Sequence, residues 1–560
     1  MITTAKYSCR CMAQALTHYG VRRAVLSPGS RNAPLAVAFA RNPELECKVV
    51  IDERSAAFVA LGMAIESGEM VAMACTSGSA ALNYAPALAE AYYRHIPLIA
   101  ITADRPEEWI DQDDSQTIRQ SGSLAAVVKG SFDIPVCRGN DEGLQRLCRR
   151  RIADAMMLAT SAPRGPVHIN IQVDEPIDAM ADISERMVFP ELTATDTQIP
   201  EAALKRLAEE INAARKVLVV AGFMPPSAKL VSCLSELPEN IAILCEVQSN
   251  LPCDRFADNI DASLSVMNEQ EKADMLSPDI VITIGGALLS RMLKEVMRKH
   301  DIRHWSIGHS DHCIDPLLHL EKRIDCSAEV FFGNISKFLT KHDDSDSYKS
   351  RWLNVSDRAR KRSFAFLTNA EWSDYKAMGL LLNAIPKGTG LHLSNGTTVR
   401  YAQLFGCAVA SRVECNRGVS GIDGCTSTAI GATFATERPI LLISGDMSAQ
   451  YDMGAFGITE IPGHFRMAVL NNGGGGIFRF IKSTRSLPEM EHYLASDVHL
   501  PLRQIAEGFG FDYYEADNAD KLSQVIPSFF AASERPAILN IITPPQTSAQ
   551  TILNYFNPKS

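Results

Sequence analysis

The sequence lacks several features that would assign it to a specialised class of protein. None of its 14 cysteines forms a C-x-x-C pair, and it contains no short-period repeat, low-complexity tract or coiled-coil pattern. No apolar run reaches the roughly 18 residues that a membrane-spanning helix requires, so we expect no membrane span. There is no excess of positive charge: the net charge is −10 over 560 residues, which argues against a general nucleic-acid-binding protein.

What remains is the composition of a large globular protein. Hydrophobic residues make up 46% of the chain and charged residues 21%, enough for substantial cores. The cysteines are scattered and several lie in apolar runs, which favours buried reduced thiols in a cytoplasmic protein over disulfides or zinc ligands. The N-terminal residues show no charged segment followed by a long apolar one, so we expect no secretory signal.

Short apolar runs alternate with helical patterns along the whole chain, which predicts βαβ units and parallel sheets. A length of 560 residues, at about 150 residues per domain, gives three or four domains. Polar stretches at 190–200 and 341–350 divide the chain into thirds. We therefore predict an α/β protein of three doubly wound domains with mainly parallel sheets, covering residues 1–185, 200–340 and 350–560.

The unusual segments of the sequence follow apolar runs that we interpret as strands. In open parallel sheets, ligands bind beyond the carboxyl ends of the strands. The segments found there are SPGSR, DERS, TSGS, TADRP, SNGTTVR, SGDMS and NNGGGG. Their common position indicates an enzyme.

The last two segments predict a site for a metal-bound diphosphate. Asp446 follows the apolar run 440–444, and Asn472 follows the run 467–470, 26 residues after Asp446. Their oxygens are hard ligands suited to Mg²⁺. The glycines after Asn472 would admit backbone N–H groups to phosphate, and the helix after Gly445 would direct its N-terminus at it. Either motif alone is weak, because Asp often caps helices and glycine runs are usually loops. Together, at this spacing, they match the thiamine diphosphate signature.

Glu53 is the candidate for the acid that this cofactor requires. Thiamine diphosphate needs a carboxyl group that hydrogen-bonds N1′ of its aminopyrimidine, favouring the imino form that removes the C2 proton. Glu53 follows the run 48–51 and opens an apolar helix, so burial should raise its pKa. The alternative is a helix N-terminal acid that complements the helix dipole, or an ion pair with Arg54.

With these motifs the sequence resembles the 2-succinyl-5-enolpyruvyl-6-hydroxy-3-cyclohexene-1-carboxylate synthases, menaquinone-pathway enzymes of the thiamine diphosphate superfamily. The resemblance is clear in the first and last thirds and weak in the middle third. The segments that carry it are SPGSRNAPL (27–35), DERSAAF (52–58), TSGSAALNYAPALAEA (76–91), PLIAITADRP (97–106), SQTIRQ (115–120) and NRGVSGIDGCTSTAIG (416–431).

The resemblance implies a pyrimidine-binding, a central and a pyrophosphate-binding domain, and a two-substrate reaction. 2-Oxoglutarate loses CO₂ on thiamine diphosphate, and the succinyl-carbanion equivalent then adds to isochorismate in a 1,4-addition. Both substrates carry two carboxylates, for which the arginine fork is suited. The resemblance also implies a homodimer or homotetramer whose active sites lie between subunits, because the acid usually comes from the partner subunit.

The resemblance assigns roles to individual residues. Glu53 and Gln116 are the catalytic candidates, and Asp446, Asn472 and the carbonyl of Gly474 would bind Mg²⁺ or Mn²⁺, with a shift of one residue in the glycine run left open. The substrate-binding candidates are Ser30, Arg31, Arg105, Arg291, Arg400 and Arg417. The cofactor-binding candidates are Glu53, Thr76, Gly396, Ile422, Gly445, Asp446, Met447, Ser448, Asn472, Gly474, Gly475, Ile477 and Phe478, with Ile422 as the apolar prop that holds the cofactor bent.

Two positions depart from the family pattern. Gly396 stands where a serine is frequent, and the middle third reads LLSRMLK, with Met292 beside Arg291 in place of a Lys-Arg or Ser-Lys pair. The rival functions are another thiamine diphosphate enzyme, such as an acetolactate synthase or 2-oxoacid decarboxylase, and a non-catalytic protein that kept the fold. The presence of Glu53, Asp446 and Asn472 argues against the second.

Overall fold

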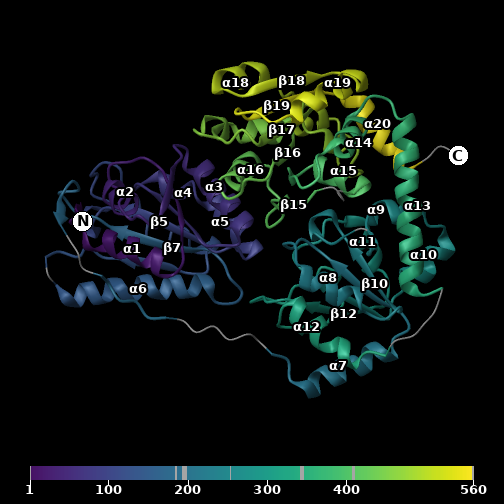
Figure 1. Cartoon of the computed structure of the whole chain (residues 1–560), viewed down its shortest axis with the longest axis horizontal. Coiled ribbons are helices and arrows are strands. Elements are labelled where there is room, and N and C mark those ends of the chain that lie inside the picture. The colour runs from purple at the N-terminus through teal and green to yellow at the C-terminus, as the bar shows by residue number, and fades with distance from the viewer. Residues whose placement is uncertain are drawn as a thin grey trace.

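The computed structural model describes residues 2–139, 141–182, 186–191, 198–252, 254–340, 346–406 and 410–557. Within them the chain forms three lobes, each built on one parallel sheet flanked by helices (Figure 1). This confirms the predicted class, an α/β protein with three mainly parallel sheets. The exact domain boundaries stay predictions, because 183–185, 192–197 and 341–345 lie outside the described residues.

The first lobe, purple to blue in Figure 1, has a six-stranded sheet in the order β3-β2-β4-β5-β7-β6. Its apolar strands are buried on both faces, which explains their continuous hydrophobic runs. The strands are β2 (Arg23–Leu26), β3 (Glu46–Val49), β4 (Val71–Cys75), β5 (Leu98–Asp104), β6 (Ser131–Ile134) and β7 (Val167–Gln172), with a separate antiparallel pair of β1 (Ile2–Thr4) and β8 (Met180–Asp182). The helices are α1 (Tyr7–His18), α2 (Ala33–Ala40), α3 (Glu53–Ser67), α4 (Ser79–Leu82), α5 (Ala85–Arg94) and α6 (Glu142–Thr160).

The middle lobe, teal in Figure 1, has a five-stranded sheet in the order β10-β9-β11-β12-β13. Two of its strands, β12 and β13, carry no motif that the sequence analysis used. The strands are β9 (Val217–Ala221), β10 (Ile241–Cys245), β11 (Ile280–Ile284), β12 (Arg303–Ile307) and β13 (Leu320–Ile324). The helices are α7 (Glu201–Ala213), α8 (Ala228–Ser235), α9 (Ile260–Val266), α10 (Glu269–Met275), α11 (Arg291–Met297) and α12 (Ala328–Ile335).

The third lobe, green to yellow, has a six-stranded sheet in the order β15-β14-β16-β17-β19-β18. From β14 the chain goes to one side for β15 and returns to the other for β16, so the order reverses between β14 and β16. The strands are β14 (Gly390–Leu393), β15 (Arg412–Cys415), β16 (Ile440–Gly445), β17 (Phe465–Asn471), β18 (Asp512–Ala516) and β19 (Ala537–Ile542). The helices are α13 (Tyr348–Asn369), α14 (Asp374–Ala384), α15 (Thr398–Phe405), α16 (Cys425–Thr433), α17 (Asp446–Tyr451), α18 (Leu502–Phe509), α19 (Ala519–Phe530) and α20 (Pro545–Phe556).

The first and third lobes pack tightly through helices α3 and α16, which lie side by side (Figure 1). A Cβ at Gly62 would lie 1.9 Å from the carbonyl oxygen of Thr428, and one at Gly431 would lie 2.2 Å from that of Val59. Only glycine permits backbones to approach so closely. The two lobes therefore share one apolar core across the helix pair.

Helix α13 links the middle and third lobes. Trp352 and Val355 near its start belong to the core of the middle lobe. No helix in the described part of the chain is long and apolar enough to cross a membrane.

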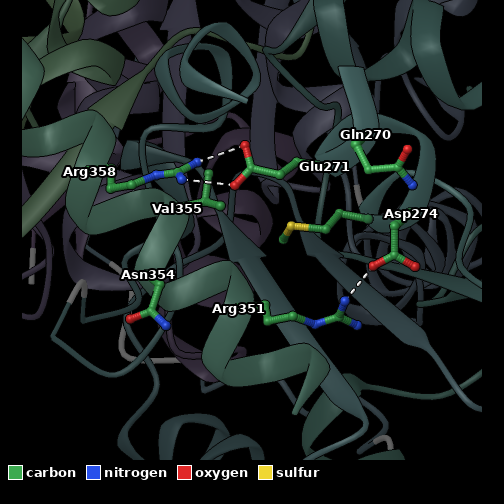
Figure 2. A pocket seen from close by; sticks show the side chains of 8 residues that line it. Gln270, Glu271, Asp274, Arg351, Asn354, Val355 and Arg358 are labelled. Carbon is green, nitrogen blue, oxygen red and sulfur yellow. Dashed lines mark hydrogen bonds and ion pairs between the residues drawn. The ribbon is translucent and has the colours of Figure 1, made fainter. Parts of the chain in front are cut away.

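A pocket of about 450 Å³ lies between α10 and α13 (Figure 2). Its charged side chains are engaged with one another: Arg358 contacts both carboxylate oxygens of Glu271, at 2.8 and 3.0 Å, and Arg351 pairs with Asp274. The ion pairs tie α13 to the middle lobe, and none of the pocket's lining residues belongs to the predicted site.

Candidate active site

Asp446 lies at the carboxyl end of β16, next to the point where the strand order reverses. It is only 1% exposed, and its carboxylate accepts hydrogen bonds from the backbone N–H groups of Met447 (2.7 Å) and Gly474 (2.9 Å). Burial raises the pKa of Asp446 to about 6; the backbone hydrogen bonds oppose this shift, and nearby Asp374 adds to it. A nearby cation would stabilise the charged form of such a buried carboxylate.

Asn472 directly follows β17, the strand that pairs in parallel with β16, so it lies at the same edge of the sheet as Asp446. It is 5% exposed, and its Nδ2 donates to a carboxylate oxygen of Asp374 at 2.7 Å. Its Oδ1 is buried and has no hydrogen-bond partner among the described residues. Leaving a buried acceptor unpaired costs about 1–3 kcal/mol, so such an atom calls for a ligand.

Some glycines of the run 473–476 are required by close packing within the chain, and others leave open space beside the backbone. Gly474 has a φ of +138°, and a Cβ there would lie 2.0 Å from the carbonyl oxygen of Ser496. A Cβ at Gly475 would contact the ring of Phe478. By contrast, a Cβ at Gly445 or Gly473 would meet no heavy atom within 4 Å. An approaching ligand therefore does not account for the whole run, because Gly474 is also required by its close contact with the segment around Ser496.

The end of β14 joins the same edge. Asn395 donates to the carbonyl oxygens of Asn416 and Gly421 and accepts a hydrogen bond from Arg417 at 3.0 Å. It thereby ties the loop after β14 to the loop after β15. Gly396 has a φ of +103° with open space beside it, so its backbone conformation explains why glycine stands there.

Ile422 and Ser448 are held together, because the hydroxyl of Ser448 donates to the carbonyl oxygen of Ile422 at 2.6 Å. Ser448 and Met447 lie in the first turn of α17, directly after Asp446. Ile477 and Phe478 lie in the short helix η6 (Gly476–Arg479) and are half-buried. All of these predicted cofactor-binding residues therefore lie on loops and helix starts that follow strands of the third lobe.

Glu53 opens α3 and is half-buried. Burial raises its pKa, its own backbone N–H opposes the shift, and Asp52 adds to it. This is the direction that the sequence analysis expects. The neighbouring Arg54 donates to the carbonyl oxygen of Tyr451 at 2.9 Å and stacks on its ring, so Arg54 is not the ion-pair partner of Glu53.

Gln116 is fixed to the loop that follows β4. Its Nε2 donates to the carbonyl oxygen of Ser77 at 2.8 Å, and the Ser77 hydroxyl donates back to the Gln116 carbonyl oxygen at 2.9 Å. Thr76, in the same loop, is 6% exposed and fills the space beside Gly29. Ser30 follows Gly29 and is exposed.

Arg31 and Arg105 are both paired within the first lobe. Arg31 is buried, donates to the carbonyl oxygen of Val173 at 2.9 Å and pairs with Glu175 at 2.9 Å. Arg105 pairs with Asp114. The carboxylates of Glu175 and Asp114 are 67% and 37% exposed, so a substrate carboxylate could replace either of them.

Arg400 and Arg417 lie at the strand ends of the third lobe. Within the described part of the chain, the guanidinium of Arg400 forms no hydrogen bond or ion pair, and the buried Nε of Arg417 has no partner. Burial lowers the pKa of Arg400; Asp261 opposes the shift, and Arg417 and Arg291 add to it. Two neighbouring guanidinium groups with unused donors are chemically suited to a carboxylate.

The middle lobe reaches this edge through helix α11 and the loop after β10. Arg291 pairs with Glu295 one turn along the helix, and its side chain is 71% exposed. Lys294 is half-buried, and this burial is the main cause that lowers its pKa. The side chain of Asn250 exchanges hydrogen bonds with the backbone of Val413, which covers the edge strand β15.

Sequence reasoning missed several residues that support the site. Glu90 of α5 accepts hydrogen bonds from the backbone N–H groups of Gly418 and Val419, both at 2.8 Å, and so fixes the loop of Arg417 from the first lobe. Asp374 accepts a hydrogen bond from the side-chain amide of Asn472. Both acids look like ordinary helix residues in the sequence; only their burial of 1% exposure marks them.

The predicted site residues of the third lobe lie together, whereas Glu53 and Gln116 of the first lobe are not bonded to them in the described part of the chain. The candidates of the third lobe follow strands of one sheet, and hydrogen bonds join Gly474 to Asp446 and Ser448 to Ile422. Within the described residues of one chain, no hydrogen bond or ion pair connects Glu53 or Gln116 to Asp446 or Asn472.

The fold and the site together define a thiamine diphosphate-dependent enzyme. Residues 9–123 match the family of the thiamine pyrophosphate enzyme, N-terminal TPP binding domain. That match covers the segments with Ser30, Glu53 and Gln116.

Near full-length relatives then identify the family. A protein of Porphyromonas gingivalis is 38% identical over 548 residues, covering 96% of this chain and 94% of the relative. Proteins of Christiangramia forsetii and Flavobacterium johnsoniae are 36% and 33% identical, over 98% and 96% of this chain and 97% and 96% of the relatives. All three are named 2-succinyl-5-enolpyruvyl-6-hydroxy-3-cyclohexene-1-carboxylate synthase. This chain belongs to that family.

Proposed function

We propose that this protein decarboxylates 2-oxoglutarate and adds the remaining succinyl unit to isochorismate, forming 2-succinyl-5-enolpyruvyl-6-hydroxy-3-cyclohexene-1-carboxylate for menaquinone biosynthesis. The observation that carries the proposal is the buried pair of Asp446 and Asn472, with an unpartnered amide oxygen, at the reversal of strand order. The family of the chain supports the choice of substrates.

The third lobe has the residues to hold thiamine diphosphate. The open space beside Gly396, Gly445 and Gly473 suits a diphosphate that must come close to the backbone. Ile422, held by Ser448, would contact the thiazolium side. When bound, this cofactor supplies the carbanion chemistry by which a 2-oxoacid loses CO₂ and its acyl unit is transferred.

A divalent cation, Mg²⁺ or Mn²⁺, would anchor the diphosphate. Its protein ligands would be the carboxylate of Asp446, the Oδ1 of Asn472 and the carbonyl oxygen of Gly474. These are hard oxygen donors, and the Asn472 oxygen is available because nothing in the described chain bonds it. The Gly474 carbonyl accepts one hydrogen bond, from Gly476 at 2.9 Å, and keeps a second lone pair.

The substrates would bind through their carboxylates. Arg400 and Arg417 have donors that the described chain does not use, and each can form two parallel hydrogen bonds to a carboxylate. Arg31 and Arg105, with Ser30 beside them, would exchange exposed acidic partners for substrate. Arg291 is placed further out, where it contributes charge rather than a fixed contact.

Glu53 would supply the acid that faces the aminopyrimidine, and a second copy of the chain would complete the site. Large exposed apolar side chains occur close to Glu53 in the chain, Ile51 at 77% and Val49 at 57%, and Tyr451, which contacts the neighbouring Arg54, is 52% exposed. A cluster of such residues beside a half-buried acid fits a surface that another subunit covers. We therefore propose a dimer or larger homo-oligomer in which Glu53 of one subunit serves the metal site of the other.

Complementation tests this arrangement. Glu53→Gln and Asp446→Ala chains are co-expressed with different affinity tags, and the mixed dimer is isolated. If the sites are shared, one of the two sites is intact and the mixed dimer has about half of wild-type turnover, although each parent is inactive. If each chain builds its own site, the mixed dimer is as inactive as its parents, and the shared-site proposal is wrong.

The reaction itself is tested with purified protein, thiamine diphosphate and Mg²⁺. Consumption of 2-oxoglutarate should depend on isochorismate and give the succinylated adduct with one CO₂. Pyruvate conversion to acetolactate at a higher kcat/KM would assign the chain to another carboligase reaction, and absence of any cofactor-dependent CO₂ release would remove the enzymatic proposal.

A further inference from the structure

We propose that Asp374 is a positioning residue that presents the amide oxygen of Asn472 to the divalent cation. This inference rests on the metal site of the proposed function and adds a residue to it that no motif of the sequence marks.

Asp374 opens helix α14 and is buried at the ends of two strands. Its carboxylate oxygens accept separate hydrogen bonds, one from Asn472 Nδ2 at 2.7 Å and one from the Thr543 hydroxyl. Its backbone N–H donates to Ser548 at 2.9 Å. Thr543 in turn donates its N–H to the carbonyl oxygen of Asn471. The carboxylate is thus held from the β17 and β19 sides at once.

The chemistry of the pair then fixes the direction of the Asn472 amide. Both carboxylate oxygens of Asp374 act as acceptors, one towards Thr543 and one towards Asn472, so the NH₂ group of the amide faces Asp374 and the carbonyl oxygen faces away. That oxygen, Oδ1, is the buried atom without a partner in the described chain. If the amide were turned over, its NH₂ group would face the cation and repel it.

The contact between Asp374 and Asn472 also sets the size of the expected effect. Groups that orient metal ligands in this way typically change metal affinity by about 10–100-fold when they are removed.

The test measures metal binding and needs no turnover. Free Mn²⁺ is followed by electron paramagnetic resonance during titration of the full-length protein with saturating thiamine diphosphate, and the melting temperature is recorded with a chelator present. We expect Asp374→Leu, whose side chain branches at Cγ like that of aspartate but accepts no hydrogen bond, to weaken Mn²⁺ binding by about 10–100-fold. Thr543→Val is the matched control: it removes the other hydrogen bond of Asp374 and should leave Mn²⁺ affinity within about threefold of wild type.

A reversed pair separates positioning from structural support. In the double variant Asp374→Asn with Asn472→Asp, the amide at 374 donates to the carboxylate at 472, whose second oxygen faces the cation. We expect Mn²⁺ affinity to return to at least the wild-type level. The inference is overturned if Asp374→Leu binds Mn²⁺ like wild type, or if the reversed pair binds no better than Asp374→Leu.

Asn472→Ala distinguishes failure of this inference from failure of the metal site. If Asn472→Ala also binds Mn²⁺ like wild type, then the proposed metal site is wrong and the role of Asp374 with it. If Asn472→Ala loses binding while Asp374→Leu keeps it, the metal site stands and only the positioning role fails.

Discussion

The two sheet edges that carry the predicted site differ in how complete they are. At the edge of the third lobe, Asp446, Asn472 and Asp374 are almost fully buried and joined through backbone and side-chain hydrogen bonds. At the edge of the first lobe, Glu53 is half-buried and Ser30 is exposed. Ile51 and Val49, which shortly precede Glu53 in the chain, are exposed apolar residues.

The difference shows which part of the site a single chain can preorganise. A cation and a diphosphate need fixed oxygens and fixed N–H groups, and these come from neighbouring strand ends of one sheet. The proposed acid, Glu53, does not belong to that sheet and opens helix α3 of another lobe. The following variants test this division, from the largest expected effect to the smallest.

Asp446→Ala should abolish metal and diphosphate binding at the edge of the third lobe. Without the carboxylate the cation loses its charged ligand, and metal anchoring of the diphosphate is worth several kcal/mol, so kcat/KM should fall by about 10³-fold or more. Calorimetric titration with thiamine diphosphate and Mg²⁺ should show cofactor binding lost as well. Asp517→Ala, an exposed aspartate on the same lobe, is the control and should retain both. Retained cofactor binding in Asp446→Ala would place the metal elsewhere.

Glu53→Gln should remove the proposed acid of the first lobe and leave the metal site of the third lobe unchanged. The amide keeps the shape but cannot act as the acid towards the aminopyrimidine, so kcat should fall by about 10²–10⁴-fold while the cofactor dissociation constant stays close to wild type. Glu69→Gln, an exposed glutamate beyond the end of α3, is the matched control. Turnover near wild type in Glu53→Gln would leave the helix-dipole explanation of this acid.

Arginine variants should rank the substrate contacts. Arg417→Lys replaces a fork held by Asn395 with a point charge, which should lower kcat/KM by about 10–100-fold, mostly through KM. Arg291→Lys changes an exposed residue and should cost less than about threefold. Equal effects in the two variants would mean that α11 closes on the substrate.

The stability of the protein should depend on pH through Asp452, which lies where the third lobe meets the first. Asp452 accepts hydrogen bonds from Ser427 and lies near Arg54 and Asp52 of the first lobe. Burial raises the pKa of Asp452 to about 7, against the opposing hydrogen bonds from Ser427. Because the folded pKa is above the unfolded value, stability from the protonated acid is fully present below about pH 4 and is lost as the pH rises to about 7.

Asp452→Asn removes that titration while keeping an acceptor for Ser427. The melting temperature of wild type, relative to the variant, should therefore fall by a few degrees between pH 4.5 and 7.5, about the range that the two pKa values define. Asp517→Asn should show no such trend. A constant difference across the series would contradict the raised pKa of Asp452.

Much of the fold followed from the sequence because it depends on local patterns. The predicted runs 440–444 and 467–470 lie in β16 (Ile440–Gly445) and β17 (Phe465–Asn471). Strands buried on both faces must be continuously apolar, so their positions and their parallel arrangement can be read directly. Strands with mixed sequences, such as β13 (Leu320–Ile324) with its alternating exposure, carry no such mark.

By itself the sequence determined the class of fold, the family and the strand-end residues that carry oxygen and guanidinium groups, because short motifs encode these. Only the tertiary structure decided which of those groups have partners. Asp374 and Glu90 are unremarkable helix acids until folding buries them against Asn472 and Gly418, and the free oxygen of Asn472 exists only because Asp374 occupies its amide nitrogen. Hydrogen-bond partners and burial depend on segments far apart in the chain, so no local pattern contains them.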